Sequence, residues 1–314
     1  MSRNELWREI KRNRVAYTYI APFYILFAVF GLFPIVMGVG LSFFKWYGTE
    51  PMSFIGLKNF TDLYNNKLFW KSLGNTATMG IIGNIINLFG AIVLAYILNS
   101  KLVKRPNIFK TIYFLPMVTS AVAAAVVFRA LFSLNSGIFN YIIQILGFER
   151  IHWLGGTGQY IKTAVIIMFS WQWMGWNMVI YLAGMQAINH DIIEAAIVDG
   201  ASHVGIFSRI TLPILKPIIL FTIIQSTIGT INLFTEPFML TGGTRMDGGA
   251  ANQGLTAMMF LLNQAPFGSN NYGFASACSV VLCAIAIIMS IIFMNALKER
   301  NEPVSKNKWG RKAL

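Results

Sequence analysis

The chain has 314 residues, of which 55% are hydrophobic and only 12% are charged, and its mean hydropathy is +0.58. Soluble domains carry about 25% charged residues, so this composition leaves too little polar surface to cover a water-exposed globule. It excludes an ordinary soluble protein and indicates a protein embedded in a membrane.

Long apolar blocks occur throughout the chain, and a helix of about 20 residues is enough to cross the hydrocarbon core. The first block follows basic residues, as a signal peptide does, but it is too long and lacks a small-residue cleavage site, so we expect it to be retained. The pattern predicts an all-α polytopic membrane protein with a cytoplasmic N-terminal segment (1–16), a six-helix transmembrane domain (17–298) and a basic cytoplasmic tail (299–314). The predicted spans are 17–44, 74–99, 111–133, 161–187, 214–236 and 273–297.

The placement of the basic residues predicts the orientation. An even number of spans puts both termini on one side, and the segments on that side hold 17 lysines and arginines against seven on the other. Cytoplasmic segments of membrane proteins are enriched in these residues, so both termini are expected to be cytoplasmic. The net charge of +13 is therefore a topology signal, and no nucleic-acid partner is expected.

The predicted extracytoplasmic segment 134–160 contains apolar residues at helical spacing. They indicate an amphipathic helix lying on the membrane surface. These residues are Ile138, Tyr141, Ile142, Ile145 and Leu146.

Polar and aromatic side chains recur on the fourth predicted span. Trp173, Asn177 and Tyr181 follow one another at i+4 steps and should share one face of the helix. Polar groups inside a bilayer tend to face a bundle interior or an aqueous path. Trp171 and Trp176 point elsewhere and are expected to pack against helices or to face lipid.

The cytoplasmic loop 188–217 predicts a short bent helix. Asp191 followed by Glu194 is a variant of the capping box, so a helix should begin near Ile192 and be interrupted by Gly200. A second short helix is expected over 202–210, before prolines mark the entry to the fifth span. The exposed apolar edge of the first helix suits docking to a cytoplasmic partner, or alternatively resting on the membrane.

The fifth predicted span carries a single polar stripe at i, i+4, i+7 and i+11, made of Gln225, Gly229, Asn232 and Glu236. Such a stripe can line a solute path, but amide side chains also hold neighbouring helices together. Both interpretations stay open for this stripe. The second span fits the packing role better, through Thr76, Gly80, Gly83 and Asn87.

Three short motifs in the loop resemble a known family. Glu194-Ala195-Ala196, then Asp199-Gly200-Ala201, then Ile210-Thr211-Leu212-Pro213, are similar to the EAA loop in permease subunits of binding-protein-dependent ABC importers. FIGLKNFTDL (54–63) and NLFTEPFMLTGG (232–243) resemble the carbohydrate branch, of the maltose and glycerol-phosphate type. The resemblance covers about residues 15 to 298 and departs at Asn189-His190-Asp191, where relatives often carry a proline.

The resemblance implies a type I ABC importer permease fold in a bacterial cytoplasmic (inner) membrane. It also implies a second homologous permease subunit, two copies of a cytoplasmic ATPase and an extracytoplasmic sugar-binding protein. Glu194 is expected to pair with a basic residue of the ATPase, and Gly200 to supply the bend. The residues implied in coupling are Glu194, Ala195, Ala196, Asp199, Gly200, Leu212 and Pro213.

The implied function is a translocation pathway for a sugar that works by alternating access. The sequence contains no G-x-x-x-x-G-K-[ST] loop, so ATP and Mg are expected on the partner ATPase and no cofactor on this chain. Arg129 is the one cation within a predicted span, which favours a neutral di- or oligosaccharide over an anionic solute. The candidate pathway residues are Trp173, Asn177, Tyr181, Gln225, Asn232 and Glu236.

Two other classes of function remain as alternatives. A stand-alone, proton-linked sugar carrier would need paired halves or several buried acids, and the spans offer only Glu236. A membrane enzyme would need clustered nucleophilic, acid–base or metal-binding residues at one depth, and the sequence shows no such cluster.

Overall fold

The computed structural model describes residues 12–100 and 103–297. The predicted basic tail (299–314), and the part of the predicted N-terminal segment before residue 12, lie outside the described residues.

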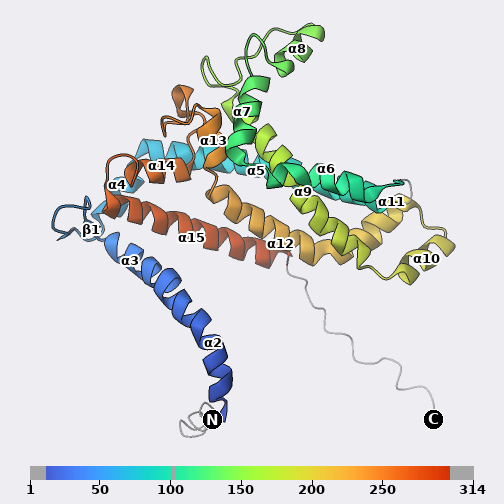
Figure 1. The fold of residues 1–314 in the computed structure, drawn as a ribbon, viewed down its shortest axis with the longest axis horizontal. Helices are drawn as coiled ribbons and strands as arrows, with labels where there is room; N and C mark the ends of the chain where they lie inside the picture. Colours follow the sequence, from blue (N-terminus) through green and yellow to red (C-terminus); the bar gives the residue numbers. More distant parts are fainter. Residues whose placement is uncertain (1–11, 101–102, 298–314) are drawn as a thin grey trace. The chain divides into compact units, whose positions relative to one another are not determined.

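Within the described part of the chain, five helices are long and apolar enough to cross a membrane, and a bent pair of helices makes up to six (Figure 1). Four of these helices overlap the predicted spans, with ends that differ by three residues or fewer except at the start of the second, which begins at Lys67; the third and fifth differ more. The helices are Arg14–Leu41, Lys67–Asn99, Pro106–Val118 with Ala121–Leu131, Ile161–Gln186, His203–Ile231 and Tyr272–Ala296.

The third predicted span, 111–133, corresponds to a pair of helices with a sharp bend between them. α6 (Pro106–Val118) and α7 (Ala121–Leu131) meet at 97°, with the break at two residues in extended conformation, Thr119 and Ser120. Pro116 lies in the last turn of α6, where its ring cannot donate a backbone hydrogen bond. The apolar composition of both halves is continuous, so hydropathy alone could not reveal the bend.

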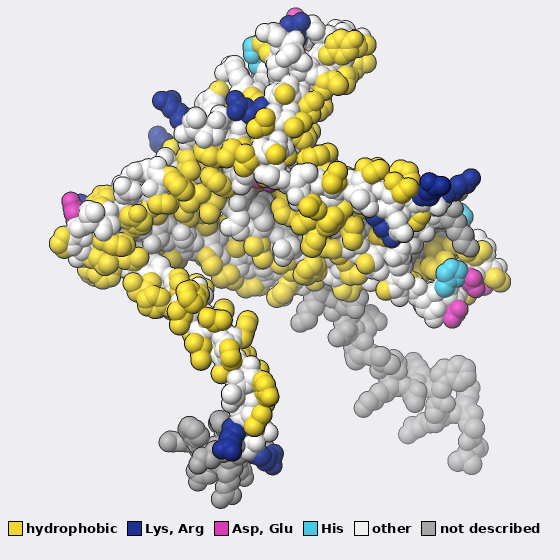
Figure 2. Space-filling view, viewed as in Figure 1, with side chains coloured by type: hydrophobic (Ala, Val, Ile, Leu, Met, Phe, Trp, Pro, Cys, Tyr) yellow, Lys and Arg dark blue, Asp and Glu magenta, His cyan; other side chains and the backbone are white. Residues whose placement is uncertain are grey.

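The described residues form two compact units, and the first comprises residues 12–69 and 261–283. Its N-terminal helix has no buried side chain along its length, and Figure 2 shows hydrophobic side chains over it. A two-stranded antiparallel hairpin and a short helix follow. The elements are α2 (Arg14–Phe27), the π-helical turn η1 (Ala28–Leu32), α3 (Phe33–Leu41), β1 (Phe44–Lys45), β2 (Ser53–Phe54) and α4 (Lys58–Tyr64).

Asn59 holds this first unit together at the end of α3. Its buried Nδ2 donates to the carbonyl oxygens of Ser42 at 2.8 Å and of Phe44 at 3.0 Å. The backbone N–H of Tyr272, from the later part of the same unit, donates to Trp46 O at 2.9 Å. The stretch 54–63 therefore has a structural role, because its Asn59 donates hydrogen bonds to two backbone carbonyls that would otherwise lack a partner at the end of α3.

The second unit comprises the described residues of 70–260 and 284–297. The expected amphipathic helix in 134–160 is present as α8 (Ile138–Ile145). The fifth span begins earlier than 214, because a helix runs without interruption from His203 to Ile231. The remaining elements, of which α5, α14 and α15 extend into the first unit, are α5 (Lys67–Asn99), α9 (Ile161–Gln186), α10 (His190–Val198), α11 (His203–Ile206), the π-helical turn η2 (Phe207–Thr211), α12 (Leu212–Ile231), α13 (Thr235–Leu240), the short η3 (Ala250–Asn252), α14 (Ala257–Gln264) and α15 (Tyr272–Leu297).

Small residues let the helices of the second unit approach closely. A Cβ on Gly175 of α9 would overlap the backbone carbonyl of Tyr113 in α6, and a Cβ on Gly80 of α5 would overlap the Thr230 side chain. Next to Gly80, Asn84 Nδ2 donates to Thr230 Oγ1 at 2.9 Å. Association in a membrane depends on such close packing and on hydrogen bonds between helices, because lipid tails are as apolar as the helices.

The contact at Gly175 predicts the effect of adding a single methyl group. Gly175→Ala should lower the free energy of unfolding by about 1–3 kcal/mol, because the new Cβ meets backbone that cannot rotate away. Thermal unfolding in detergent measures this as a lower Tm. Gly74→Ala is the matched control on α5, since no atom lies within 4 Å of its Cβ position and alanine favours a helix interior. Equal Tm values for the two variants would contradict the close approach of α6 and α9.

Candidate functional site

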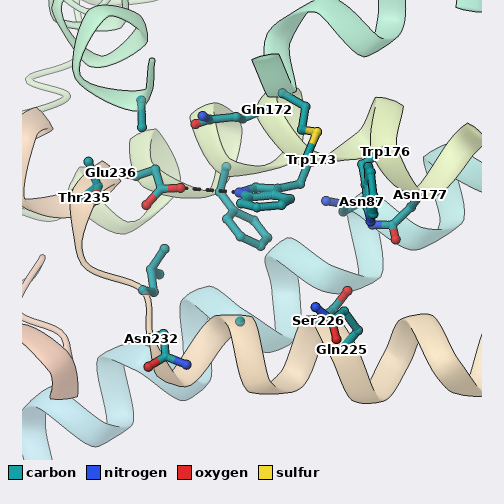
Figure 3. Close-up of a pocket in the computed structure, with 15 residues that line it drawn as sticks. Asn87, Gln172, Trp173, Trp176, Asn177, Gln225, Ser226, Asn232, Thr235 and Glu236 are labelled. Atoms are coloured by element: carbon teal, nitrogen blue, oxygen red, sulfur yellow. Dashed lines mark hydrogen bonds between the residues drawn. The ribbon is translucent and has the colours of Figure 1, made fainter. Parts of the chain in front are cut away.

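A cavity of about 530 Å³ lies in the second unit, among α5, α9, α12 and α13 (Figure 3). Its volume falls in the range of ligand pockets, which measure about 300–1,000 Å³. Polar and aromatic side chains interrupt its otherwise apolar wall. They are Asn87, Gln172, Trp173, Trp176, Asn177, Gln225, Ser226, Asn232, Thr235 and Glu236.

α9 contributes one face of its helix to the cavity. Trp173 and Asn177 both line it, as their i+4 spacing predicts. Asn177 Nδ2 donates to Asn87 Oδ1 at 2.9 Å, and both side chains are buried. Asn87 thus packs α5 against α9, as expected of the second span, and also reaches the cavity wall.

Tyr181 is not brought to this cavity. Its side chain is fully buried, and its hydroxyl lies 2.6 Å from Thr222 Oγ1 in α12. Met178, Leu182 and Leu215 belong to the same buried cluster. The hydroxyl already has a partner there, so in this structure Tyr181 joins two helices and does not line the cavity.

The polar stripe predicted on one continuous fifth span is divided between two helices, so that prediction is wrong in its geometry. α12 ends at Ile231, Asn232 is its C-cap, and Glu236 lies in the separate helix α13. The side chain of Asn232 donates to Ile228 O at 3.0 Å. Gln225, Asn232 and Glu236 nevertheless all line the cavity, because the chain turns after Ile231 and places α13 against α9.

Glu236 is the acidic group of the cavity and is only 7% exposed. Its Oε1 accepts a long hydrogen bond of 3.4 Å from Trp173 Nε1. No residue of the described segments forms an ion pair with it. A carboxylate in so apolar a place is costly and is normally retained for a role.

Sequence reasoning missed several lining residues, above all Gln172 and Trp176. Gln172 is 5% exposed, and its Oε1 has no hydrogen-bond partner among the described residues. Trp176 was expected to pack or to face lipid together with Trp171, but it lines the cavity, whereas the Trp171 ring packs 5.2 Å from that of Phe128. The available signal was the i+4 spacing of 172 and 176, which places them on one face.

The second candidate site is α10, in the loop between α9 and α12. Asn189 caps this helix, because its Oδ1 accepts from Asp191 N at 3.0 Å; the expected capping by Asp191 is therefore wrong. The side chain of Glu194 points to solvent and lies 3.0 Å from His190 Nδ1. The apolar edge is exposed, with Val198 87% accessible. Figure 2 shows histidine and acidic side chains gathered around α10.

Gly200 ends α10 in a left-handed conformation with φ +79°. Its N–H donates to Ile197 O at 3.0 Å, and the N–H of Ala201 donates to Ala196 O at 2.9 Å. This is the Schellman arrangement, which needs a residue with positive φ. Asp199 precedes it as the C-cap of α10.

The chain after Gly200 returns to the bundle as one continuous helix. The predicted second short helix therefore begins near residue 202 as expected, but it does not end at 210. Ser202 Oγ caps the start by accepting from Gly205 N at 3.2 Å. A π-helical turn over Phe207–Thr211 leads directly to Leu212 and Pro213 in the first turn of α12. The Phe207 ring lies 4.6 Å from that of Tyr96, which anchors this segment to α5.

The conformation of Gly200 predicts a difference between two substitutions. Gly200→Val should loosen the end of α10, because a β-branched residue is strained at positive φ by at least about 1–2 kcal/mol. Hydrogen exchange should become faster at the amides of residues 195–201, while the bundle is unchanged. Gly200→Asn should exchange almost as slowly as the parent protein, since asparagine tolerates this conformation. Equally fast exchange in both variants would show that the glycine is needed because a side chain does not fit there, and not because of its backbone conformation.

Comparison with known proteins gives consistent matches over nearly the whole chain. The sequence pattern of the family described as binding-protein-dependent transport system inner membrane component matches residues 91–304. A lactose transport system permease protein of Rhizobium radiobacter is 36% identical over 95% of this chain and 98% of its own length. An arabinooligosaccharides transport system permease protein of Bacillus subtilis is 35% identical over 91% and 90%.

Solved structures show the same fold. The crystal structure of a bacterial ABC transporter that imports the acidic polysaccharide alginate contains a chain with a TM-score of 0.81 and 23% identity, covering 95% of this chain and 100% of the other. A second structure, in complex with a periplasmic protein that holds an alginate pentasaccharide, gives a TM-score of 0.80 at 23% identity over 93% and 97%. The predicted fold of an all-α permease of an ABC importer is therefore confirmed.

Proposed function

This chain belongs to the family of binding-protein-dependent transport system inner membrane components, and from that membership we propose that it forms the pathway for a neutral di- or oligosaccharide. It is a membrane-spanning permease subunit of an ABC transporter and not the ATPase. The observation that carries the sugar proposal is the cavity of about 530 Å³, with amide, hydroxyl and indole groups set among apolar helices.

Sugars suit such a wall because they present hydroxyl groups at their edges and C–H groups on their faces. Amides such as Asn177 and Gln225 can bond hydroxyls, and the ring of Trp173 can pack on the apolar face. Relatives that are at least 34% identical are named for lactose and for arabinooligosaccharides. We infer that this chain carries solutes of the same class by alternating access.

α10 is proposed to couple this pathway to a cytoplasmic ATPase. The exposed carboxylate of Glu194 can meet a basic residue, and the apolar edge of Ala195, Ala196 and Val198 can enter a groove. Gly200, with Leu212 and Pro213, sets the return of the chain to the bundle. Two copies of the ATPase would hold ATP and Mg, so that this chain needs no cofactor of its own.

A second homologous permease subunit and an extracytoplasmic sugar-binding protein complete the proposed assembly. The helix Arg14–Leu41 supports the need for other partners, because none of its side chains is buried among the described residues of its own unit. Membrane lipid or the second permease would cover it. The excess of basic residues supports a bacterial inner-membrane location with both termini cytoplasmic.

Family membership favours a role as a subunit of an ABC importer over a role as a stand-alone sugar carrier. Purification of the chain from its native membrane in mild detergent tests the proposal. We expect an ATPase and a second permease to accompany it, and liposomes holding the complex to take up sugar only when ATP and the binding protein are present. Purification of the chain alone, with sugar transport in the absence of ATP, would overturn the proposal.

The role of α10 predicts a loss of coupling on charge reversal. Glu194→Lys should lower ATP-driven uptake about tenfold or more, since a hydrogen bond to a charged partner contributes about 1.5–3 kcal/mol. Insertion and Tm should not change, because Glu194 lies on the protein surface. Glu149→Lys is the matched control, an exposed glutamate outside the loop, and should transport normally. Normal uptake by Glu194→Lys would remove the coupling assignment.

A further inference from the structure

A groove of about 470 Å³ lies on a different face of α9 from the cavity described above. Three helices of the second unit form its wall, through Ile86 of α5, Ile112 and Pro116 of α6, and Ile167 and Trp171 of α9. Ile86, Ile112 and Trp171 are 46%, 56% and 42% exposed. The groove is therefore open at the surface of this unit, where a ligand can enter it from the membrane.

The wall of the groove asks for no hydrogen bond from its occupant. Most of its side chains are hydrocarbon, and the buried hydroxyl of Ser170 already donates to Gly83 O at 3.5 Å. The buried polar side-chain atoms that lack a partner among the described residues belong to Asn84, Trp153 and Gln172, and none of these residues lines the groove. Such a wall suits a hydrocarbon chain and offers little to a polar solute.

The length of the groove distinguishes a lipid chain from a helix of another protein. Its lining on α9 runs from Ile166 to Gly175, which is about 14 Å along a helix. The hydrocarbon core is about 30 Å thick, so one leaflet takes up about half of that. The other rim cannot extend the groove, because α6 ends at Val118, where the chain bends by 97°. The groove therefore matches an acyl chain of one leaflet and is too short for a spanning helix.

Basic side chains gather at one end of this groove. Lys104, Arg105 and Lys110 lie at the start of α6, and Figure 2 shows Lys and Arg side chains at the right-hand end of that helix. None of the three forms an ion pair with a carboxylate of the described residues. Lys110 precedes Tyr113, a lining residue, by three positions, so their Cβ atoms are about 5–6 Å apart. A bias toward basic residues on the cytoplasmic side explains their sign, but not their place beside an apolar groove.

We propose that this groove binds an acyl chain of an anionic phospholipid, whose headgroup lies against Arg105 and Lys110. From the first residue of α6 to Ile112 the helix rises about 9 Å, so a headgroup held at its start leaves the deeper part of the chain beside the groove. Basic pockets between membrane helices recognise lipid headgroups in this way. The site is independent of the solute that the first cavity carries, and the lipid chain would support α9 on the face that does not line that cavity.

The test uses the complete transporter as purified from its membrane, placed in phosphatidylcholine nanodiscs. The probes are phosphatidylglycerol and phosphatidylcholine with identical chains, one of which is brominated near its middle, because bromine quenches indole fluorescence on contact. The signal of Trp171 is the difference between the parent protein and Trp171→Phe, which removes the indole that lines the groove. We expect half-maximal quenching at a mole fraction at least about fivefold lower for the brominated phosphatidylglycerol.

Charge removal separates selection of the headgroup from binding of the chain. The double variant Arg105→Gln, Lys110→Gln should quench at about the same mole fraction of either lipid, because the groove is intact and only the cations are lost. Its Tm in pure phosphatidylcholine should equal that of the parent, since neither side chain is fully buried. Arg209→Gln is the matched control, an exposed arginine of η2 and not of α6, and should keep the full preference for phosphatidylglycerol.

Three results would overturn the lipid site. Equal quenching of the parent protein by both lipids would show that only non-selective lipid surrounds the groove. No quenching of Trp171 by either lipid would show that another protein segment, such as a helix of the second permease, covers it. A preference for phosphatidylglycerol that persists in the double variant would show that these two cations do not hold the headgroup. None of these results bears on the family assignment or on the solute.

Discussion

The structure depends on one constraint, that polar groups among apolar helices must find partners within the protein. Asparagine side chains meet much of this demand. Asn59 donates to two carbonyls at the end of α3, Asn75 Nδ2 donates to Asn252 O and Leu255 O at 2.9 and 3.0 Å, and Asn140 joins the ends of its own loop. Asn84 and Asn87 connect α5 to α12 and α9.

The sequence predicts the membrane class, the positions of most long helices and the turn at Gly200, because each depends on local signals. An apolar block needs only its length, and Gly200 ends a helix through its own conformational freedom. The errors arise where two local signals compete. At α10, the sequence analysis predicted Asp191 as the cap, and the structure uses Asn189, two residues earlier. Periodicity does not decide between adjacent residues of equal capping ability.

The cavity was harder to predict because it depends on bends that hydropathy does not record. The break after Ile231 turns what looked like a stripe on one helix into contributions from α12 and α13. Helical spacing still found Trp173, Asn177, Gln225, Asn232 and Glu236, since each faces inward in its own element. Tyr181, one turn beyond Asn177, lies beside Thr222 and not at this cavity, and helical spacing did not single out Gln172.

The two candidate sites are connected by continuous helices. α9 carries Gln172, Trp173 and Asn177 and ends at Gln186, four residues before α10 begins. On the other side of the loop, the helix from His203 runs without interruption to the cavity at Gln225, and Phe207 contacts Tyr96. A movement of α10 would therefore be transmitted directly to α9 and α12, the two helices that contribute most to the cavity wall. The π-helical turn at Phe207–Thr211 is the irregular place in this connection, and such turns often occur where function requires a helix to adjust.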